Sequence, residues 1–230
     1  MGRASADDAS DERARIHALR ELPVDQWPTR ERILREASRF FAARGYVGAT
    51  TREIAAAVGI RQPSLYNHFA SKQEIAEGLL DYDLRAGLAF MAPLVAEGGS
   101  AAVRIYRYIR WEIAHCLESP FDLRALYSTG LFDQPEFARW RVLLDGYEGS
   151  IRDLVRLAVE DGEFIDIDPE FARMAIDALV METIRANGLD QAYSADQPER
   201  AADFLLRAML REPHELAAIR ARAIAVEAVG

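Results

Sequence analysis

Two side-chain amides and a proline lie close together in one short stretch of the chain, at Gln62, Pro63 and Asn67. Glutamine and asparagine can each pair with N6 and N7 of adenine through two hydrogen bonds, and a proline ring can contact the methyl group of thymine. On the exposed face of a helix, these residues predict contacts with base edges in the major groove of DNA. The alternative is that they are solvated residues of an ordinary surface helix.

The residues before this stretch predict the first of two short helices. Thr50 and Glu53 have the spacing of a capping box, in which each side chain bonds the backbone N–H of the other residue. The apolar Ile54, Ala55 and Val58 then recur at helical spacing. We therefore expect a helix that begins at Thr50 and buries one face.

A tight turn and a second helix follow. Gly59 can adopt the left-handed conformation that ends a helix. Pro63 suits the first turn of the next helix, where its missing N–H costs no hydrogen bond. Leu65 and Phe69 are four residues apart and give that helix a buried face. Helix, short turn with glycine and helix is the arrangement that places a recognition helix in the major groove.

Residues 50–72 resemble the DNA-binding segment of the tetracycline-repressor (TetR-type) regulators. The matching positions are Thr51, Ile54, Ala55, Gly59, Ile60, Ser64, Leu65, Tyr66, His68, Phe69, Ser71 and Lys72. This number of matches at fixed spacing is a specific signal, whereas a bare helix-turn-helix pattern is weak. Arg61 departs from the family pattern, which usually has serine or another small polar residue there, so the start of the recognition helix lacks a side-chain cap.

The resemblance implies that Tyr66, His68 and Lys72 occupy phosphate-binding positions. Arg52 and Arg61 add positive charge beside them. Phosphate contacts position a protein on DNA and carry little sequence information. The complete set of candidate DNA-binding residues is Thr51, Arg52, Arg61, Gln62, Pro63, Ser64, Tyr66, Asn67, His68 and Lys72.

The net charge of −9 over 230 residues would by itself argue against nucleic acid as a partner. The charge is unevenly distributed, however. Residues 28–72 contain eight basic and three acidic residues, which gives this segment +5 and leaves −14 for the rest of the chain. A basic segment on an acidic protein suits DNA binding at one face. Lys72, the only lysine, lies in this segment.

The whole chain predicts an all-α fold, because no stretch shows the sustained alternation of a β-strand. We expect a flexible N-terminal arm over residues 1–27, whose contact with DNA is left open. A three-helix domain with the helix-turn-helix motif should cover residues 28–73, and a larger helical effector-binding and dimerisation domain residues 74–230. The helix that leads into the larger domain is expected to run from residue 72 to about 91 and to end before Pro93.

The family resemblance also implies an effector pocket in the C-terminal helices, whose ligand cannot be carried over because this domain is the family's most variable part. The candidate lining residues are Tyr108, Trp111, His115, Phe132, Trp140, Tyr147, Met174, Met181 and Glu182. Such side chains commonly line small-molecule cavities. The alternative is that this aromatic stripe is ordinary hydrophobic core.

We expect the last helices to pack against those of a second copy as a four-helix dimer interface. Small and apolar residues make up the candidate interface: Ala175, Ala178, Phe204, Leu205, Ala208 and Met209. A homodimer suits a reader of the major groove, because two recognition helices about 34–36 Å apart match successive turns of a palindrome.

Several other classes of function lack support in the sequence. The single cysteine, Cys116, excludes an internal disulfide and suits a reducing cytoplasm. The N-terminal residues lack the apolar region of a secretory signal, and no apolar run is long enough to span a bilayer. His115 and Cys116 have no further ligand at metal-binding spacing, and the motifs of common hydrolases, nucleotide-binding enzymes and metalloproteases are absent. We expect no catalytic residue, metal or cofactor.

These features predict a ligand-responsive transcriptional repressor that binds a palindromic operator as a homodimer. The first alternative is an activator or an effector-independent regulator of the same family. A remote alternative is a helical small-molecule-binding protein or enzyme that does not bind DNA.

Overall fold

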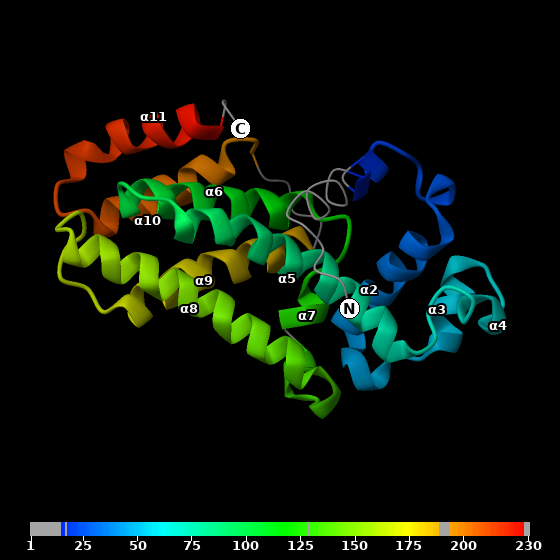
Figure 1. Ribbon diagram of the computed structural model, residues 1–230. Helices are drawn as coiled ribbons and strands as arrows, with labels where there is room; N and C mark the ends of the chain where they lie inside the picture. Colours follow the sequence, from blue (N-terminus) through cyan, green and yellow to red (C-terminus); the bar gives the residue numbers. More distant parts are fainter. Residues whose placement is uncertain (1–14, 17, 128, 189–193, 228–230) are drawn as a thin grey trace. The chain divides into compact units, whose positions relative to one another are not determined.

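The computed structural model describes residues 15, 16, 18–127, 129–188 and 194–227. Most of these residues lie in helices (Figure 1). The described part contains no extended strand, only an isolated antiparallel bridge between Phe164 and Leu210. The all-α fold expected from the sequence, with an N-terminal helix-turn-helix and a larger helical C-terminal part, is therefore confirmed.

The helices group into two compact units. Unit 1 comprises Met1–Ala89, Glu118–Leu144 and Asn187–Leu189, and unit 2 comprises Phe90–Leu117, Asp145–Ala186 and Asp190–Gly230. The long helices α5 (Lys72–Ala96) and α8 (Ala138–Glu160) contribute residues to both units. The edge of unit 1 does not coincide with the domain boundary expected near residue 73.

The other elements of unit 1 are η1 (Val24–Gln26), α2 (Thr29–Gly48), α3 (Thr51–Val58), α4 (Gln62–Leu65), α7 (Arg124–Tyr127), η2 (Leu131–Asp133) and η3 (Pro135–Phe137). Those of unit 2 are α6 (Ala101–Glu118), α9 (Pro169–Asn187), α10 (Gln197–Met209), η4 (Pro213–Glu215) and α11 (Leu216–Glu227). Glu118 and Asn187, the last residues of α6 and α9, belong to unit 1.

Helix α2 supports the helix-turn-helix through one apolar face. Ile33, Ala37 and Phe41 recur at helical spacing and are fully buried. Gly45 has a φ of 73°, in the left-handed region, and interrupts the regular helix. The ring of Tyr46, just after this break, packs edge-on against Phe41 with 5.6 Å between centroids.

The described part of the N-terminal segment is packed, not free. Ile16, Leu19 and Trp27 are buried in unit 1. The Arg15 guanidinium lies 2.7 Å from the buried carboxylate of Glu31. The expectation of a flexible arm is therefore wrong for this part, because its apolar side chains have a buried position. Residues 1–14 and 17 lie outside the described part.

Helix α5 continues past Pro93 to Ala96, whereas the sequence analysis ended it before this proline. A proline inside a helix removes one backbone hydrogen bond and costs about 3 kcal/mol. Burial of Met91 and Leu94 on either side of Pro93 offsets this cost. The Arg104 guanidinium, itself buried, completes the helix end by donating to the carbonyl oxygens of Leu94, Glu97 and Gly99.

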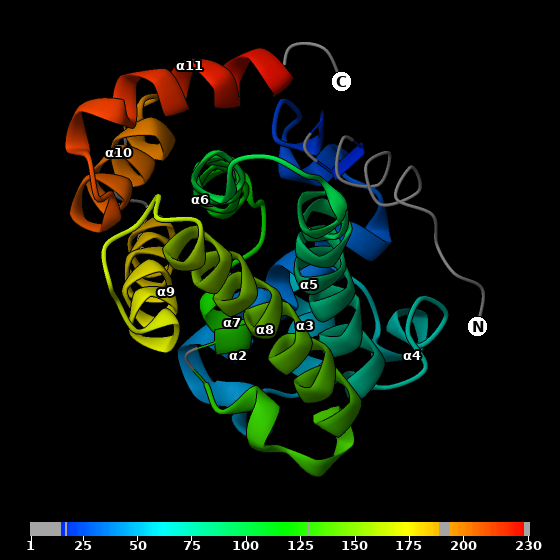
Figure 2. The ribbon, with the colours of Figure 1, turned by 60° about the vertical axis from the view of Figure 1, so that its left-hand side comes forward.

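Unit 2 is built around α6, which Figure 2 views nearly along its axis with α9 and α10 beside it. Residues on most sides of this helix are buried, including Ile105, Tyr106 and Ile109. Polar contacts tie α6 to α10, since the Tyr106 hydroxyl donates to Asp203 at 3.0 Å and the Arg110 guanidinium lies 2.6 Å from Glu199. A helix buried on most sides is expected at the centre of a core.

Candidate nucleic-acid interface

Both ends of α3 are closed as the sequence predicts. The Thr50 hydroxyl accepts from the Glu53 backbone N–H at 3.3 Å, and the Thr50 N–H donates to the Glu53 carboxylate at 3.2 Å. At the other end, Gly59 has a φ of 79°, and the Gly59 and Ile60 N–H groups donate to carbonyls of the last turn. These local bonds set the direction in which the chain enters α4.

Helix α4 is shorter than a full recognition helix. Its regular part ends at Leu65, and turn-type hydrogen bonds carry the chain from there to Phe69. Arg61 precedes it without a side-chain cap, as the departure from the family pattern predicts. Leu65 and Phe69 are buried, so the opposite side of this segment faces outward.

The candidate DNA-binding residues lie together on α3, on α4 and directly after them (Figure 1). Those that are exposed are Arg52, Arg61, Pro63, Tyr66, Asn67 and His68, and those that are half-buried are Thr51, Gln62, Ser64 and Lys72. The surface offers side-chain amides for base edges together with hydroxyl and basic groups for phosphates.

Three of these side chains are joined by hydrogen bonds. The Gln62 amide Nε2 donates to the Thr51 hydroxyl at 2.9 Å, and the Thr51 and Tyr66 hydroxyl oxygens lie 3.2 Å apart. Thr51 opens α3, Gln62 opens α4 and Tyr66 directly follows α4. The bonds therefore connect the two helices across their turn on the outward side.

Lys72 has a second role that its position in the motif does not reveal. Its ammonium donates to the carbonyl oxygens of Tyr46 at 2.8 Å, Ala49 at 3.1 Å and Val47 at 3.5 Å. It also lies 4.4 Å from the centre of the Tyr46 ring. An ammonium has three donors, and all of them are directed at the last turn of α2 and the loop that follows it.

Several other basic residues of this segment are engaged within unit 1. Arg44 pairs with Glu53 at 2.6 Å, Arg32 donates to the carbonyl of Val58, and Arg30 lies over the Phe69 ring. The bonds from Thr50 and Arg44 lower the pKa of the Glu53 carboxyl. Much of the +5 charge therefore stabilises the fold. Arg52 and Arg61 are the exposed cations beside α4 itself.

Comparison with known proteins identifies this segment. Residues 33–79 match the family model of the bacterial regulatory proteins of the tetR family. The transcriptional repressor AcnR of Corynebacterium efficiens is 30% identical over 152 residues, which are 62% of this chain and 77% of that protein. The chain belongs to the tetR family of bacterial regulatory proteins. Like AcnR, it is a DNA-binding transcriptional regulator.

Solved structures of the family extend the likeness beyond the helix-turn-helix. AmtR of Mycobacterium smegmatis superposes with a TM-score of 0.73 and 27% identity, over 87% of this chain and 96% of that one. AibR, solved in complex with isovaleryl coenzyme A and operator DNA, has the same fold with a TM-score of 0.63 and 19% identity, over 81% and 99% of the two chains.

Two kinds of feature are absent from the described residues. No helix there is both long and apolar enough to cross a bilayer. No group of three or more histidine, cysteine, aspartate or glutamate side chains there is arranged to hold a metal ion.

Part of the aromatic set expected to line an effector pocket is brought together in unit 2. The Tyr147 hydroxyl donates to Glu112 at 2.6 Å, and the Tyr108 and Tyr147 rings lie edge-on at 6.1 Å. Burial, followed by the nearby Glu112 carboxylate, raises the pKa of both phenols. Trp111 stacks on His115, with 4.9 Å between ring centroids. Tyr108, His115 and Tyr147 are buried, whereas Trp111 and Glu112 are half-buried. We call these five residues the α6 cluster.

The remaining pocket candidates do not belong to this cluster. Met174, Met181 and Glu182 are exposed on the outer face of α9, so their assignment to a pocket within the chain is wrong. Phe132 and Trp140 belong to unit 1, where the Phe132 ring packs against Tyr127 and Trp140 is buried. The methionines were misplaced because α9 carries apolar residues on two sides.

The residues expected at the dimer interface fall into an exposed group and a buried group. Ala175, Ala178, Phe204 and Ala208 are exposed on α9 and α10. Leu205 and Met209 are only 6% and 3% exposed, because they face the core of unit 2, so their assignment to the interface is wrong.

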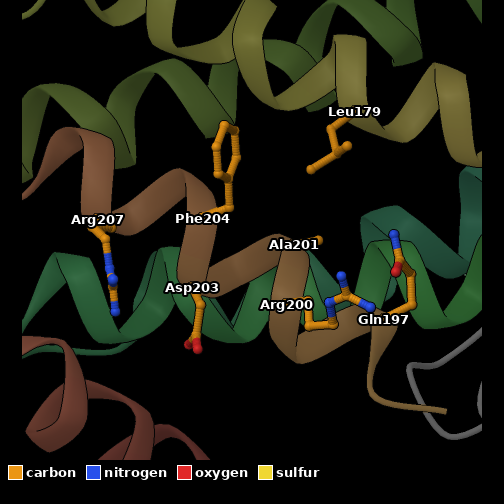
Figure 3. Close-up of a pocket in the computed structure, with 7 residues that line it drawn as sticks. All are labelled: Leu179, Gln197, Arg200, Ala201, Asp203, Phe204 and Arg207. Atoms are coloured by element: carbon orange, nitrogen blue, oxygen red, sulfur yellow. The ribbon is translucent and has the colours of Figure 1, made fainter. Parts of the chain in front are cut away.

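Residues that were not predicted from the sequence complete this outer face. Phe171 is 62% exposed on α9, in line with the exposed Met174. An open groove on unit 2 is lined by Leu179, Gln197, Arg200, Ala201, Asp203, Phe204 and Arg207, with Phe204 and Asp203 on opposite sides of α10 (Figure 3). The spacing of Phe171, Met174, Ala178 and Met181, which recurs every three or four residues, was the signal available in the sequence.

Proposed function

We propose that this regulator is a repressor, that it binds a palindromic operator as a homodimer, and that a small-molecule effector held in unit 2 releases it. The observation that carries the proposal is the outward side of α4. There Gln62 is held by Thr51, and Asn67 is exposed beyond a turn closed at Gly59. Rigid presentation of amides favours selective pairing with bases.

Within this proposal the candidate residues divide by chemistry. Gln62 and Asn67 read base edges, and Pro63 contacts a thymine methyl group. The exposed Arg52 and Arg61 bind phosphates, together with Tyr66 and His68. Thr51 and Ser64 lie among them, and Lys72 supports the loop before α3. A phosphate contact by Lys72 requires its ammonium to give up a carbonyl partner.

The proposed dimer is supported by the outer face of unit 2. Phe204 and Phe171 are 71% and 62% exposed, and the exposed alanines of α9 permit close approach of a second helix. Contiguous exposed apolar surface on a protein of this size marks an interaction site. A two-fold dimer presents two copies of α4 to half-sites about 34–36 Å apart.

The proposed effector site is the α6 cluster. A neighbour with the same fold, AibR, was solved with both isovaleryl coenzyme A and operator DNA. Here the buried Tyr108 and Tyr147 supply aromatic surface, and Glu112 supplies a hydrogen-bond acceptor. The effector shifts the equilibrium toward release only if it binds the released state more tightly. No catalytic step is part of the proposal, and the proposed location is the cytoplasm, with the operator.

The test is fluorescence anisotropy of the purified protein with labelled duplex DNA from upstream of its own gene, at several salt concentrations. We expect salt-dependent binding that is tighter than to a shuffled duplex of equal length. Asn67→Ala should relax preference at one base pair, whereas Arg61→Ala should weaken binding to both duplexes about equally. Absence of salt-dependent binding to any duplex would favour the alternative of a helical binding protein or enzyme.

The sign of regulation needs a separate measurement. A reporter gene behind the bound promoter should be expressed more strongly when the regulator is deleted. Lower expression in the deletion strain would identify an activator.

A further inference from the structure

Thr51 lies between the side chain proposed to read a base and the side chain proposed to bind a phosphate. Its hydroxyl oxygen is 2.9 Å from the Gln62 amide nitrogen and 3.2 Å from the Tyr66 hydroxyl oxygen. Thr51 and Gln62 are half-buried, whereas Tyr66 is 45% exposed. The three side chains form one hydrogen-bonded row on the outward side of the motif.

The direction of these bonds follows from the chemistry of the groups. An amide nitrogen only donates, so the Thr51 oxygen accepts from Gln62. The one hydroxyl hydrogen of Thr51 is then available for the Tyr66 oxygen, which leaves the Tyr66 hydrogen free to point outward. A phosphate oxygen only accepts, so a phosphate beside Tyr66 selects this arrangement over the reverse one, in which Tyr66 donates to Thr51. Hydrogen bonds aligned in one direction also polarise and strengthen each other.

The same row leaves Gln62 able to read a base. Its amide nitrogen carries two hydrogens, of which Thr51 engages one, and its carbonyl oxygen has no part in that bond. One N–H and one C=O are the groups that pair with N7 and N6 of adenine. Because the bond to Thr51 restricts the rotation of the Gln62 amide, less conformational freedom is lost when it pairs.

We propose that Thr51 is a positioning residue for DNA recognition: it orients the Gln62 amide toward a base and the Tyr66 hydrogen toward a phosphate. This inference rests on the proposed function. It makes the base contact and the phosphate contact interdependent, because both use the same threonine hydroxyl. A direct Thr51–phosphate bond would instead have no effect on base preference.

The test uses duplexes selected by the wild-type protein from a randomised duplex pool, followed by anisotropy with the best duplex and with variants at each base pair. Thr51→Val keeps the shape and removes the hydrogen bonds. We expect binding to the selected duplex to weaken by up to about tenfold, the size of one or two net hydrogen bonds. We also expect discrimination to fall at the base pair where Gln62→Ala loses it. Thr51→Ser keeps the hydroxyl and should retain both the affinity for the selected duplex and the discrimination at that base pair.

The controls separate positioning from folding and from direct contact. Thr129→Val removes another half-buried threonine hydroxyl, which donates to the Ala125 carbonyl, and should leave DNA binding unchanged. In a Gln62→Ala background, Thr51→Val should cause no further loss of base discrimination. If Thr51→Val melts below Thr129→Val, Thr51→Ala is measured beside it, at a temperature where all variants are folded.

Two outcomes would overturn the inference while the proposed function stands: Thr51→Val binds all duplexes as the wild type does, or it weakens all of them equally with base preference intact. If the wild-type protein selects no sequence from the pool, the proposed function itself fails.

Discussion

The ammonium nitrogen of Lys72 lies 2.8 Å from the carbonyl oxygen of Tyr46, although the two residues are separated by 26 positions. The C-terminal end of α2 is thus held by the first residue of α5. Tyr46 in turn packs on Phe137 with 5.1 Å between ring centroids. The sole lysine of the chain is therefore a structural residue of the helix-turn-helix, whatever contact it makes with DNA.

Replacement of Lys72 by methionine should lower the stability of unit 1. The side-chain stem is kept, but the carbonyl oxygens of Tyr46 and Ala49 lose their donor. Because the site is half exposed and water can replace the ammonium, we expect a loss of about 1 kcal/mol and a decrease in melting temperature of about 2–4 °C. Chemical denaturation and calorimetry measure both values.

Arg61→Met is the matched control for that experiment. Arg61 is exposed and directly precedes α4 without a side-chain cap. We expect unchanged stability and a salt dependence of DNA binding that decreases by about one phosphate contact. If Lys72→Met lowers DNA binding as Arg61→Met does but leaves stability unchanged, the structural role of Lys72 is wrong.

Local patterns predicted the helix-turn-helix well because its bonds connect residues close in sequence. The capping box joins Thr50 to Glu53, and the Gly59 turn closes onto the helix directly before it. The role of Lys72 depends on a contact with a distant loop, which no local pattern contains. The same holds for Trp27, which the sequence assigned to a flexible arm and which is buried.

The face of α9 could not be assigned from periodicity alone. This helix has one apolar stripe that includes the buried Ile176 and Val180, and a second that includes the exposed Phe171 and Met174. Both stripes have helical spacing, so the sequence does not tell which one meets the core of the same chain. Only the packing of unit 2 separates a core face from a face left for a partner.

The buried Arg104 should matter more to stability than an exposed arginine. In Arg104→Met, the carbonyl oxygens of Leu94, Glu97 and Gly99 lose their common donor at the end of α5. Because buried polar groups without partners are costly, we expect a loss of about 2–4 kcal/mol. Amide hydrogen exchange in the last turn of α5 should also become faster.

Arg85→Met on α5 serves as its control. The side chains of Arg85 and its partner Asp81 are both well exposed, and exposed ion pairs contribute about 0–1 kcal/mol. Equal losses for the two variants would contradict the role assigned to Arg104.

Asp177 should make stability depend on pH in an unusual direction. Burial raises its pKa to about 6, against the opposing effect of Arg173, with Glu148 and Glu170 also facing it. Because the folded state holds the proton more tightly than the unfolded state, the free energy of unfolding should decrease as the pH rises from about 4 to about 6. Asp177→Asn should remove this part of the pH dependence, as measured by urea denaturation across the range.

Two other carboxyls on α9 make the stability depend on pH in a lower range. Arg173 lowers the pKa of Glu170 to about 2, and Arg185 lowers that of Glu182. The ionised form of each carboxyl therefore stabilises the folded state at pH values above its pKa in the unfolded chain. This contribution is lost as the pH falls below about 4. Glu182→Gln is the control and should leave the change in the free energy of unfolding between pH 5 and 6 as it is in the wild type. If the free energy of unfolding depends on pH in the same way in the wild type and in Asp177→Asn, Asp177 has an ordinary pKa.

Phe204→Asp should dissociate the proposed dimer. The Phe204 ring is 71% exposed on α10, at the groove shown in Figure 3. If this face packs against a second copy, an aspartate there must be buried without a partner, at a cost typical of an interface hot spot. We expect the dimer dissociation constant to rise by about thirtyfold or more, as measured by sedimentation velocity.

Ile224→Asp on α11, which replaces another exposed apolar residue, should leave the dimer intact. Operator affinity should fall with Phe204→Asp alone, because a monomer reaches only one half-site. Equal sedimentation of both variants, or a monomeric wild-type protein, would contradict the assignment of this face to a second copy.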